Sequence, residues 1–232
     1  WLVDRQAMTP PARHGELVAI VIDASDAQAG AEHLLLARVV AVRQVIPAYK
    51  ALAVDGKVEI TTSPYYHPIL PLLYDLAVAR EVSPGLGLPA HPIACPEDAR
   101  KQLDMAMEAH CAIFGQSPEG LWPSEGGVSE AMLPDVADRG FAWLASDENV
   151  LARSLGVEIQ RNESGHVLNP EVLYRPYQVG SNGQSLTLVF RDRFLSDQIG
   201  FAYGHWKAQS AVDDLMERLH LIHKDLKGGG LV

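Results

Sequence analysis

The sequence predicts an α/β protein built on a largely parallel sheet, and three observations support this class. Short apolar runs alternate along the chain with segments of helical periodicity, which is the pattern of repeated strand–helix units. The chain has 232 residues, of which 47% are apolar and 21% charged, as expected of one large domain with a substantial core. Four of the apolar runs lead directly into polar or acidic residues, which places the candidate chemistry at strand ends.

The first half of the chain contains one element with clear boundaries, a helix over residues 96–114. Proline suits the first turn of a helix, Glu97 and Asp98 face the positive end of its dipole, and Gly115 ends it. His110 lies on the apolar face of this helix, so we interpret it as a core histidine. The other predicted elements here are an apolar run of either type at 17–22, a helix at 31–52 and a strand at 57–62.

The second half of the chain repeats strands and helices at shorter intervals. The predicted elements are a strand at 120–123, a helix at 129–139, a strand at 141–145, a hairpin of strands at 172–179 and 186–190, and a helix at 211–227. Residues 180–183 have the composition of a hairpin connection. Ser146 is the predicted N-cap of the helix that follows strand 141–145, and Asp197 is expected at a helix start.

The polar residues at the strand ends are expected to lie close together. They are Thr62-Ser63 leading to His67, Ser124-Glu125, Ser146-Asp147-Glu148, and Arg191-Asp192. In a β/α barrel the reacting groups come from the C-terminal ends of several different strands. An open parallel sheet also binds ligands at this edge. Four such clusters favour a barrel with an acidic, sugar-sized cleft over a layered sheet.

Glu125 is the acid whose neighbours best suit work on a sugar. Cleavage of a glycosidic bond usually needs two carboxyl groups, one to attack or activate water and one to protonate the departing oxygen. Trp122 lies three residues earlier and offers a ring on which the C–H face of a pyranose packs. Gly126-Gly127 leaves the following backbone unshielded, which suits substrate approach and a tight turn equally. The structural alternative is a solvated acid in a turn or at a helix start.

Three longer segments carry a resemblance to a known family. Residues 56–73 (GKVEITTSPYYHPILPLL) look like the second signature region of glycoside hydrolase family 57, and residues 120–129 (GLWPSEGGVS) resemble its third region. Residues 190–201 (FRDRFLSDQIGF) are similar to a segment shared by one large branch of the family. The matches occur in the expected order between about residue 31 and residue 227.

The resemblance implies an incomplete seven-stranded, TIM-like (β/α) barrel that acts on α-linked glucans with retention of configuration. Residues 1–232 are then a partial catalytic barrel, truncated at both ends, without the first strand and the region after residue 232. Members include α-amylases, amylopullulanases, branching enzymes, glucanotransferases and α-galactosidases. The nucleophile is expected at Glu125, and His67 is expected to line the subsite of the attacked sugar. No metal or other cofactor is expected.

Four further residues are expected to bind substrate, namely Tyr66, Trp122, Asp147 and Asp192. For Asp192 the structural alternative is an ion pair with Arg191 or Arg193, and for Asp147 and Glu148 it is the first turn of a helix. The family's general acid is an Asp in a later region that this chain does not contain. We therefore expect the parent protein to be an enzyme and this chain alone to be inert.

Two other functions remain as alternatives. The first is a carbohydrate-binding or regulatory barrel that has lost the chemistry. The second is a metal-dependent polysaccharide deacetylase, which the absence of any His-x-x-x-His pair disfavours. His220 and His223 are interpreted as surface residues. Other aromatic residues are interpreted mainly as core, although they could stack on sugars; they are Tyr65, Phe201, Tyr203 and Trp206.

Composition excludes several classes of partner. A net charge of −10 without a basic cluster argues against binding of nucleic acid, because phosphate neutralisation requires grouped Lys and Arg. The sequence contains no run of about 18 apolar residues and no N-terminal signal pattern, so no membrane span is predicted and a cytoplasmic location is expected. Cys95 and Cys111 are expected to be reduced, partly buried thiols.

Overall fold

Residues 42–54 form a helix in the computed structural model, which describes residues 42–181 and 184–226. This helix belongs to the first of two compact units, residues 1–59, and the second unit covers residues 60–232. The helix ends in a turn at Asp55-Gly56, where the Lys57 N–H donates to the Leu52 carbonyl at 2.9 Å. The predicted helix at 31–52 is confirmed over its described part and continues to residue 54, whereas the run at 17–22 lies outside the described residues.

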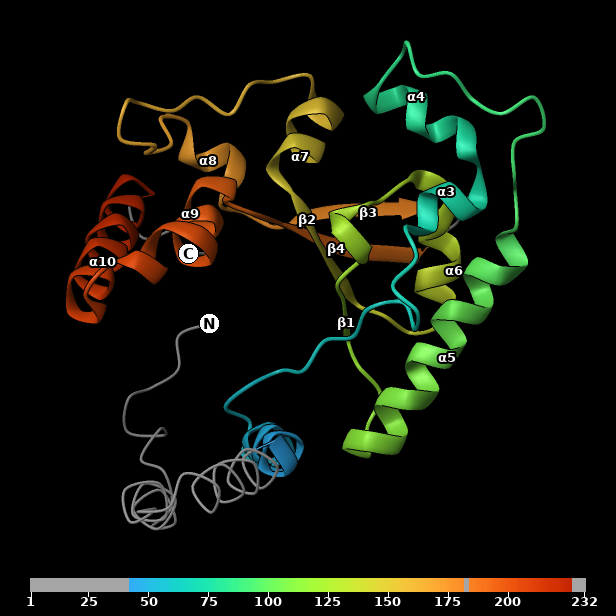
Figure 1. The fold of residues 1–232 in the computed structure, drawn as a ribbon, viewed down its shortest axis with the longest axis horizontal. Coiled ribbons are helices and arrows are strands. Elements are labelled where there is room, and N and C mark those ends of the chain that lie inside the picture. The colour runs from blue at the N-terminus through green and yellow to red at the C-terminus, as the bar shows by residue number, and fades with distance from the viewer. Residues whose placement is uncertain (1–41, 182–183, 227–232) are drawn as a thin grey trace, which may run out of the picture. The chain divides into compact units, whose positions relative to one another are not determined.

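The second unit contains a mixed sheet in which the parallel strands are added in chain order (Figure 1). Within the described residues, its strands are β1 (Gly120–Leu121), β2 (Trp143–Asp147), β3 (Tyr177–Ser181) and β4 (Gln184–Arg191). The sheet order is β1-β2-β4-β3, with β1, β2 and β4 parallel and β3 antiparallel to β4. An isolated parallel bridge joins Thr62 to Leu121 and extends this order by one position beyond β1.

The expected α/β class with a largely parallel sheet is confirmed, but several strand boundaries were wrong. The strand predicted at 57–62 is reduced to the bridge at Thr62, and the strand at 120–123 to two residues. Proline at position 123 has no N–H for the ladder, so pairing stops before it. The strand predicted at 141–145 is shifted by two residues in β2. A hairpin forms as predicted, but from β3 and β4, because residues 172–173 belong to a short helix.

Helices connect and cover the strands. Their bounds are α3 (Leu70–Tyr74), α4 (Ala79–Val82), α5 (Pro96–Phe114), α6 (Leu133–Asp138), α7 (Glu148–Leu155), α8 (Pro170–Leu173), α9 (Arg193–Asp197) and α10 (Ala208–Asp225). Short 3₁₀ turns occur at η1 (Leu76–Val78), η2 (Ser124–Gly126), η3 (Glu130–Met132) and η5 (Tyr203–His205), and a π-helical turn at η4 (Gln198–Ala202). The predicted helix at 129–139 corresponds to η3 and α6 together.

The sequence signals for helix ends were right for α5 and wrong for α7. Gly115 adopts the left-handed conformation expected of a residue that closes α5. Ser146, the predicted N-cap, instead lies inside β2, and Asp147 caps α7 by accepting a hydrogen bond from the Asn149 N–H. Asp197 directly precedes the π-helical turn η4 and makes no side-chain cap, and it is also the last residue of α9, which Asp192 caps through the Leu195 N–H.

Two apolar clusters form the core of this unit. The first packs one face of the sheet against α3, α5 and α6; its buried members are Leu70, Ala99, Leu103, Leu121, Met132, Val136, Phe141, Leu144, Leu186 and Leu188. The second joins α7, α8 and α10; its buried members are Leu151, Val167, Leu173, Tyr174 and Ile222. Figure 1 shows α8, α9 and α10 gathered where β4 leads into α9. On α10, which corresponds to the helix predicted at 211–227, Ile222 is the buried residue among the described positions.

His110 is a core histidine, as predicted. Its side chain is buried on α5, and its ring nitrogens lie 2.9 Å from the Gln116 carbonyl oxygen and 3.1 Å from the Ile60 carbonyl oxygen. The histidine therefore ties the helix to the segment that leads to Thr62. Cys95 and Cys111 are free and half-buried, which agrees with the expected thiols.

Leu144 lies in the middle of β2 with none of its surface exposed, so its truncation tests the position of the core. We expect Leu144→Ala to lower the free energy of unfolding by about 2–5 kcal/mol, because it removes buried methyl groups and leaves a cavity. Leu221→Ala on the exposed face of α10 is the matched control and should change stability by less than about 0.5 kcal/mol. Urea denaturation of both variants measures the difference, and equal effects would contradict the described core.

Candidate active site at the strand ends

The polar clusters predicted at the strand ends do meet at one edge of the sheet. Parallel pairing places Ser146 opposite Phe190 and Asp147 opposite Arg191, so β2 and β4 end side by side. Thr62 and Leu121 are paired in the same direction, which brings the segments leading to His67 and Glu125 to the same edge. This agrees with the rule that parallel strands present functional groups at their C-terminal ends.

Glu125 lies in this edge with an unusual backbone conformation. Its φ of 57° and ψ of 19° are left-handed, a region that an L-residue other than glycine rarely adopts. His67 has a φ of 59°, and these are the non-glycine residues with positive φ in the described part of the chain. Such a conformation costs about 1–3 kcal/mol and persists when the surroundings impose it, most often at functional sites.

Packing on both sides imposes the turn at Glu125. The Ser146 hydroxyl donates to the Gly126 carbonyl at 2.6 Å, and a Cβ added to Gly126 would lie 3.6 Å from the Asp147 backbone nitrogen. On the other side, a Cβ added to Gly127 would approach the Ile69 side chain to 3.2 Å. The turn is therefore wedged between the end of β2 and the segment that follows His67.

The side chains of Glu125 and His67 face each other and remain open to solvent. The distance from His67 Nε2 to Glu125 Oε1 is 3.5 Å, and the two side chains are 52% and 73% exposed respectively. Tyr66 is also 73% exposed and makes an edge-to-face contact with Tyr65. A carboxylate and an imidazole thus lie next to each other at the surface, and the residue before the imidazole carries an exposed ring.

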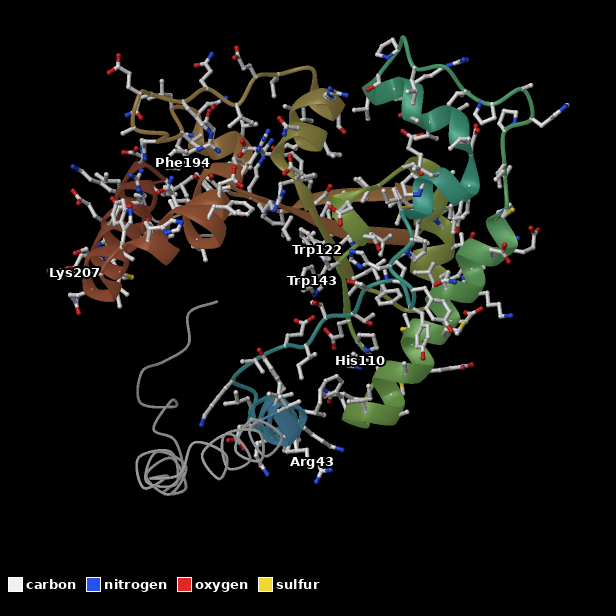
Figure 2. The ribbon with its side chains drawn as sticks, viewed as in Figure 1. Arg43, His110, Trp122, Trp143, Phe194 and Lys207 are labelled. Carbon is white, nitrogen blue, oxygen red and sulfur yellow. The ribbon has the colours of Figure 1, made fainter. Side chains whose placement is uncertain are left out.

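A second group at this edge consists of Trp122, Asp147 and Arg191. Figure 2 labels Trp122, which directly follows β1. The Arg191 guanidinium carbon lies 6.0 Å from the centre of the Trp122 ring, and Arg191 Nε donates to Asp147 Oδ2 at 3.0 Å. Asp147 lies beside the turn, since a Cβ added to Gly126 would meet its backbone nitrogen at 3.6 Å, so this group borders the Glu125 turn.

Behind the exposed groups lies a buried polar network around Arg161. The Arg161 guanidinium pairs with Glu148 Oε2 and donates to Asp192 Oδ1 at 3.0 Å. Tyr174 donates its hydroxyl to Asp192 Oδ2 at 2.5 Å, and the Leu195 N–H donates to Asp192 Oδ1 at 2.9 Å. Arg161 therefore joins the residue after the end of β2 to the residue after the end of β4.

This network was not predicted in its true form. The expected partner of Asp192 was Arg191 or Arg193, but its partner is Arg161, which comes from the connection between α7 and α8. Glu148 directly follows β2 and Asp192 directly follows β4, and both side chains are buried. Two buried carboxylates require a cation nearby. This need for a cation could have predicted an arginine partner from the sequence, but it could not identify Arg161 among the arginines of the chain.

Burial dominates the electrostatics of the network. Loss of solvent raises the pKa of Glu148 above its ordinary 4.5, against the lowering effects of the Arg193 N–H and the Arg161 guanidinium. Burial and the neighbouring Asp192 carboxylate raise the pKa of the Tyr174 hydroxyl well above its usual range. Tyr174 is therefore a permanent proton donor to Asp192 at neutral pH.

The described residues give no indication of a metal centre. Residues 42–181 and 184–226 contain no group of three or more His, Cys, Asp or Glu side chains arranged to hold a metal ion. His220 and His223 are exposed on α10, as the sequence suggested. Among the helices described, none is long and apolar enough to cross a membrane.

Comparison with known families gives a match over most of the chain. The family model described as "Glycosyl hydrolase family 57" matches residues 38–232. This range contains the three segments that carry the resemblance in the sequence, and it contains Glu125 and His67. No curated protein matches the chain.

Solved structures with similarity to the chain include three enzymes. A 4-α-glucanotransferase from Thermococcus litoralis is 18% identical (TM-score 0.46), with 73% of this chain and 21% of that chain covered. An α-amylase from Thermotoga maritima is 16% identical (TM-score 0.49; 80% and 32% covered). A branching enzyme from Thermococcus kodakaraensis, solved with glucose, is 19% identical (TM-score 0.49; 91% and 44% covered). The chain thus spans less than half of each of these proteins.

Removal of the Arg161 charge tests the buried network. We expect Arg161→Met to lower the free energy of unfolding by about 3–5 kcal/mol, because Glu148 and Asp192 stay buried without their cation. Arg153→Met makes the same substitution on the exposed face of α7 and should alter the free energy of unfolding by less than about 0.5 kcal/mol. Chemical denaturation of the two variants gives the comparison, and a mild effect at Arg161 would show that the acids are not held by it.

The raised pKa of Glu148 predicts a dependence of stability on pH. Above pH 4.5 the unfolded chain loses this proton before the folded protein does, so the free energy of unfolding falls as pH rises from 4.5 through the raised pKa. Glu148→Gln does not titrate and lacks this fall. The difference in stability, wild type minus variant, should therefore decrease across this interval in urea denaturation series between pH 4 and pH 7. A difference that stays constant or increases would contradict the described burial.

Proposed function

The chain belongs to glycosyl hydrolase family 57, and we propose that the protein containing it cleaves or transfers α-linked glucans with retention of configuration. The observation that carries the proposal is the placement of Glu125, an exposed carboxylate held in a strained turn at the C-terminal edge of parallel strands. A site of this kind, with a neighbouring imidazole and aromatic rings, suits a neutral, ring-shaped substrate.

In this proposal Glu125 is the nucleophile. One of its carboxylate oxygens attacks the anomeric carbon, the bond from that carbon to the glycosidic oxygen breaks, and the departing oxygen receives a proton from a general acid. Water or a sugar hydroxyl then displaces Glu125 and restores the original configuration, which yields hydrolysis or transfer. A fixed turn favours this step, because the carboxylate is held in place before the substrate arrives.

The neighbours of Glu125 are assigned to substrate binding. His67 lies close enough to Glu125 to contact the same sugar, and Trp122 and Tyr66 offer surfaces for the C–H face of a pyranose. Asp147 lines the opposite side of the turn. Asp192, also predicted to bind substrate, is buried with both oxygens engaged by intramolecular donors, which favours a role in holding the strand ends.

The general acid is assigned to a carboxyl group other than the acids at these strand ends. Asp147 is paired with Arg191, and Glu148 and Asp192 are paired with Arg161. A neighbouring guanidinium favours the ionised carboxylate and so opposes the donation of a proton. Glu148 has a raised pKa, but it is buried and engaged by Arg161 and by the Arg193 N–H, so substrate cannot reach it.

The proposal includes the incomplete seven-stranded barrel, with residues 1–232 as part of its catalytic domain. Parallel strands that are added in chain order, from Thr62 through β1 and β2 to β4, support it, because such an order continues into a barrel without reversal. The alternative is a barrel that binds glucans without cleaving them. The pairing of the strand-end acids favours this alternative, since no proton donor is identified among the described acids at this edge.

Substitution of Glu125 distinguishes the proposed enzyme from the alternative, a barrel that only binds glucans. In the full-length parent, Glu125→Gln should lower kcat/KM on amylose by several orders of magnitude, because the change removes the attacking charge and conserves shape. Glu130→Gln, five residues later and also exposed, is the control and should retain activity. Reducing-sugar release and product analysis measure both outcomes.

A chemical complementation experiment identifies the role of Glu125 more closely. With Glu125→Ala and an α-glucosyl fluoride, azide should replace the missing carboxylate, so that the C–F bond breaks, a C–N bond forms and a β-glucosyl azide appears. If Glu125→Gln keeps full turnover, Glu125 is not the nucleophile. If the parent binds amylose without any turnover, the binding alternative is correct.

A further inference from the structure

Arg191 is a cation of the candidate site to which the sequence assigned, at most, an ion pair with Asp192, and its partner in the structure is Asp147. We propose that Arg191 is a substrate-binding residue that recognises the paired 2- and 3-hydroxyl groups of a glucose unit lying on Trp122. The inference rests on the proposed function and extends it, since it names the part of the sugar that this side of the site binds.

The first observation is that Arg191 is only partly used within the protein. Its Nε donates to Asp147 Oδ2 at 3.0 Å, and among the described residues no hydrogen-bond partner is found for its two terminal nitrogens. The side chain is 44% exposed. Arginine carries five N–H donors in a planar fork. Four of those donors therefore point from a fixed position toward solvent or a ligand.

The second observation is that Arg191 is held in place from behind. Its partner Asp147 is fixed by two bonds to Oδ1, from the Asn149 N–H at 2.9 Å and from the Asn149 amide at 2.8 Å. Asp147 and Arg191 are register partners at the last pair of β2 and β4. The Arg161 network then joins the residues that follow each of them. Little side-chain entropy is left for a ligand to remove.

The third observation is the position of the guanidinium over Trp122. The guanidinium carbon lies 6.0 Å from the ring centre, so the aromatic face and the donor fork border the same space. A pyranose that packs its C–H face on an indole directs its equatorial hydroxyls outward from the ring edge. A donor fork at that edge donates to two adjacent hydroxyl oxygens, in the same way that it donates to the two oxygens of a carboxylate.

The chemistry of the ligand follows from this arrangement. In an α-1,4-linked glucan the 1- and 4-positions of an internal glucose are occupied by linkages, and the 2- and 3-hydroxyls stay free and adjacent. The Asp147 carboxylate can accept from one of these hydroxyls while Arg191 donates to both. The site therefore fits an internal glucose unit of an α-1,4-glucan, next to the Glu125 turn.

A ligand-and-variant cycle on the full chain tests the proposal. Calorimetry would measure binding of maltoheptaose and of its 2,3-di-O-methyl derivative to the unaltered chain and to Arg191→Gln. We expect Arg191→Gln to weaken maltoheptaose binding roughly 10- to 100-fold, the range for hydrogen bonds to a charged group. The methylated ligand should bind the unaltered chain weakly, and Arg191→Gln should weaken it little further. A merely structural role for Arg191 would not produce this dependence on the hydroxyls.

Arg175→Gln is the matched control, because Arg175 is exposed and lies 4.7 Å over the ring of Tyr177. It should bind maltoheptaose like the unaltered chain. Equal binding by Arg191→Gln and the unaltered chain overturns the role of Arg191 and leaves the proposed function intact. An equal loss for both ligands or for Arg175→Gln also overturns it. Failure of the unaltered chain to bind maltoheptaose overturns the inference together with the proposed glucan site.

Discussion

The left-handed backbone of Glu125 is the constraint on which the candidate site depends. A glutamate does not adopt this conformation by preference, so its neighbours must impose it. On one side the Ser146 hydroxyl at the end of β2 holds the carbonyl of Gly126, whose φ of 68° suits glycine, and on the other side Gly127 allows Ile69 to approach. The same turn carries the carboxylate that faces His67, and the backbone of Asp147 lies beside it at Gly126. The packing that holds Glu125 in its strained conformation therefore also positions the neighbouring segments of the candidate site.

The site is built in two layers with different physical tasks. The outer layer is exposed and polar, with Glu125, His67 and Arg191 available to a ligand. The inner layer is buried, and there Arg161 neutralises two acids that would otherwise be costly to bury. Since Glu148 and Asp192 directly follow Asp147 and Arg191 in the chain, the inner layer fixes the ends of the strands that carry the outer one. Both acids are buried and engaged by Arg161, which separates them from the role of proton donor to a substrate.

Local signals predicted much of the fold, and long-range contacts explain the rest. The helix at 96–114 was predicted to the residue, because proline and glycine mark its two ends. The strand at 57–62 was not, since its pairing depends on a neighbour distant in sequence and is limited to Thr62. Ser146 has the composition of an N-cap, but its hydroxyl binds the carbonyl of Gly126, twenty residues earlier. Arg161 was missed for the same reason: nothing near it in the sequence indicates the two acids that it joins.

The most direct measurement is to trap the covalent intermediate in the full-length parent. A 5-fluoro-α-glucosyl fluoride should react with the nucleophile and form an intermediate that accumulates. The fluorine at C5 slows both displacements, but the fluoride at C1 is a good leaving group and keeps the first one fast enough to occur. Digestion and peptide mass spectrometry then locate the sugar. We expect the fluorinated sugar on Glu125, within the segment 120–129, and no labelled peptide from a Glu125→Gln variant. A label on Asp147, Glu148 or any other carboxylate would contradict it.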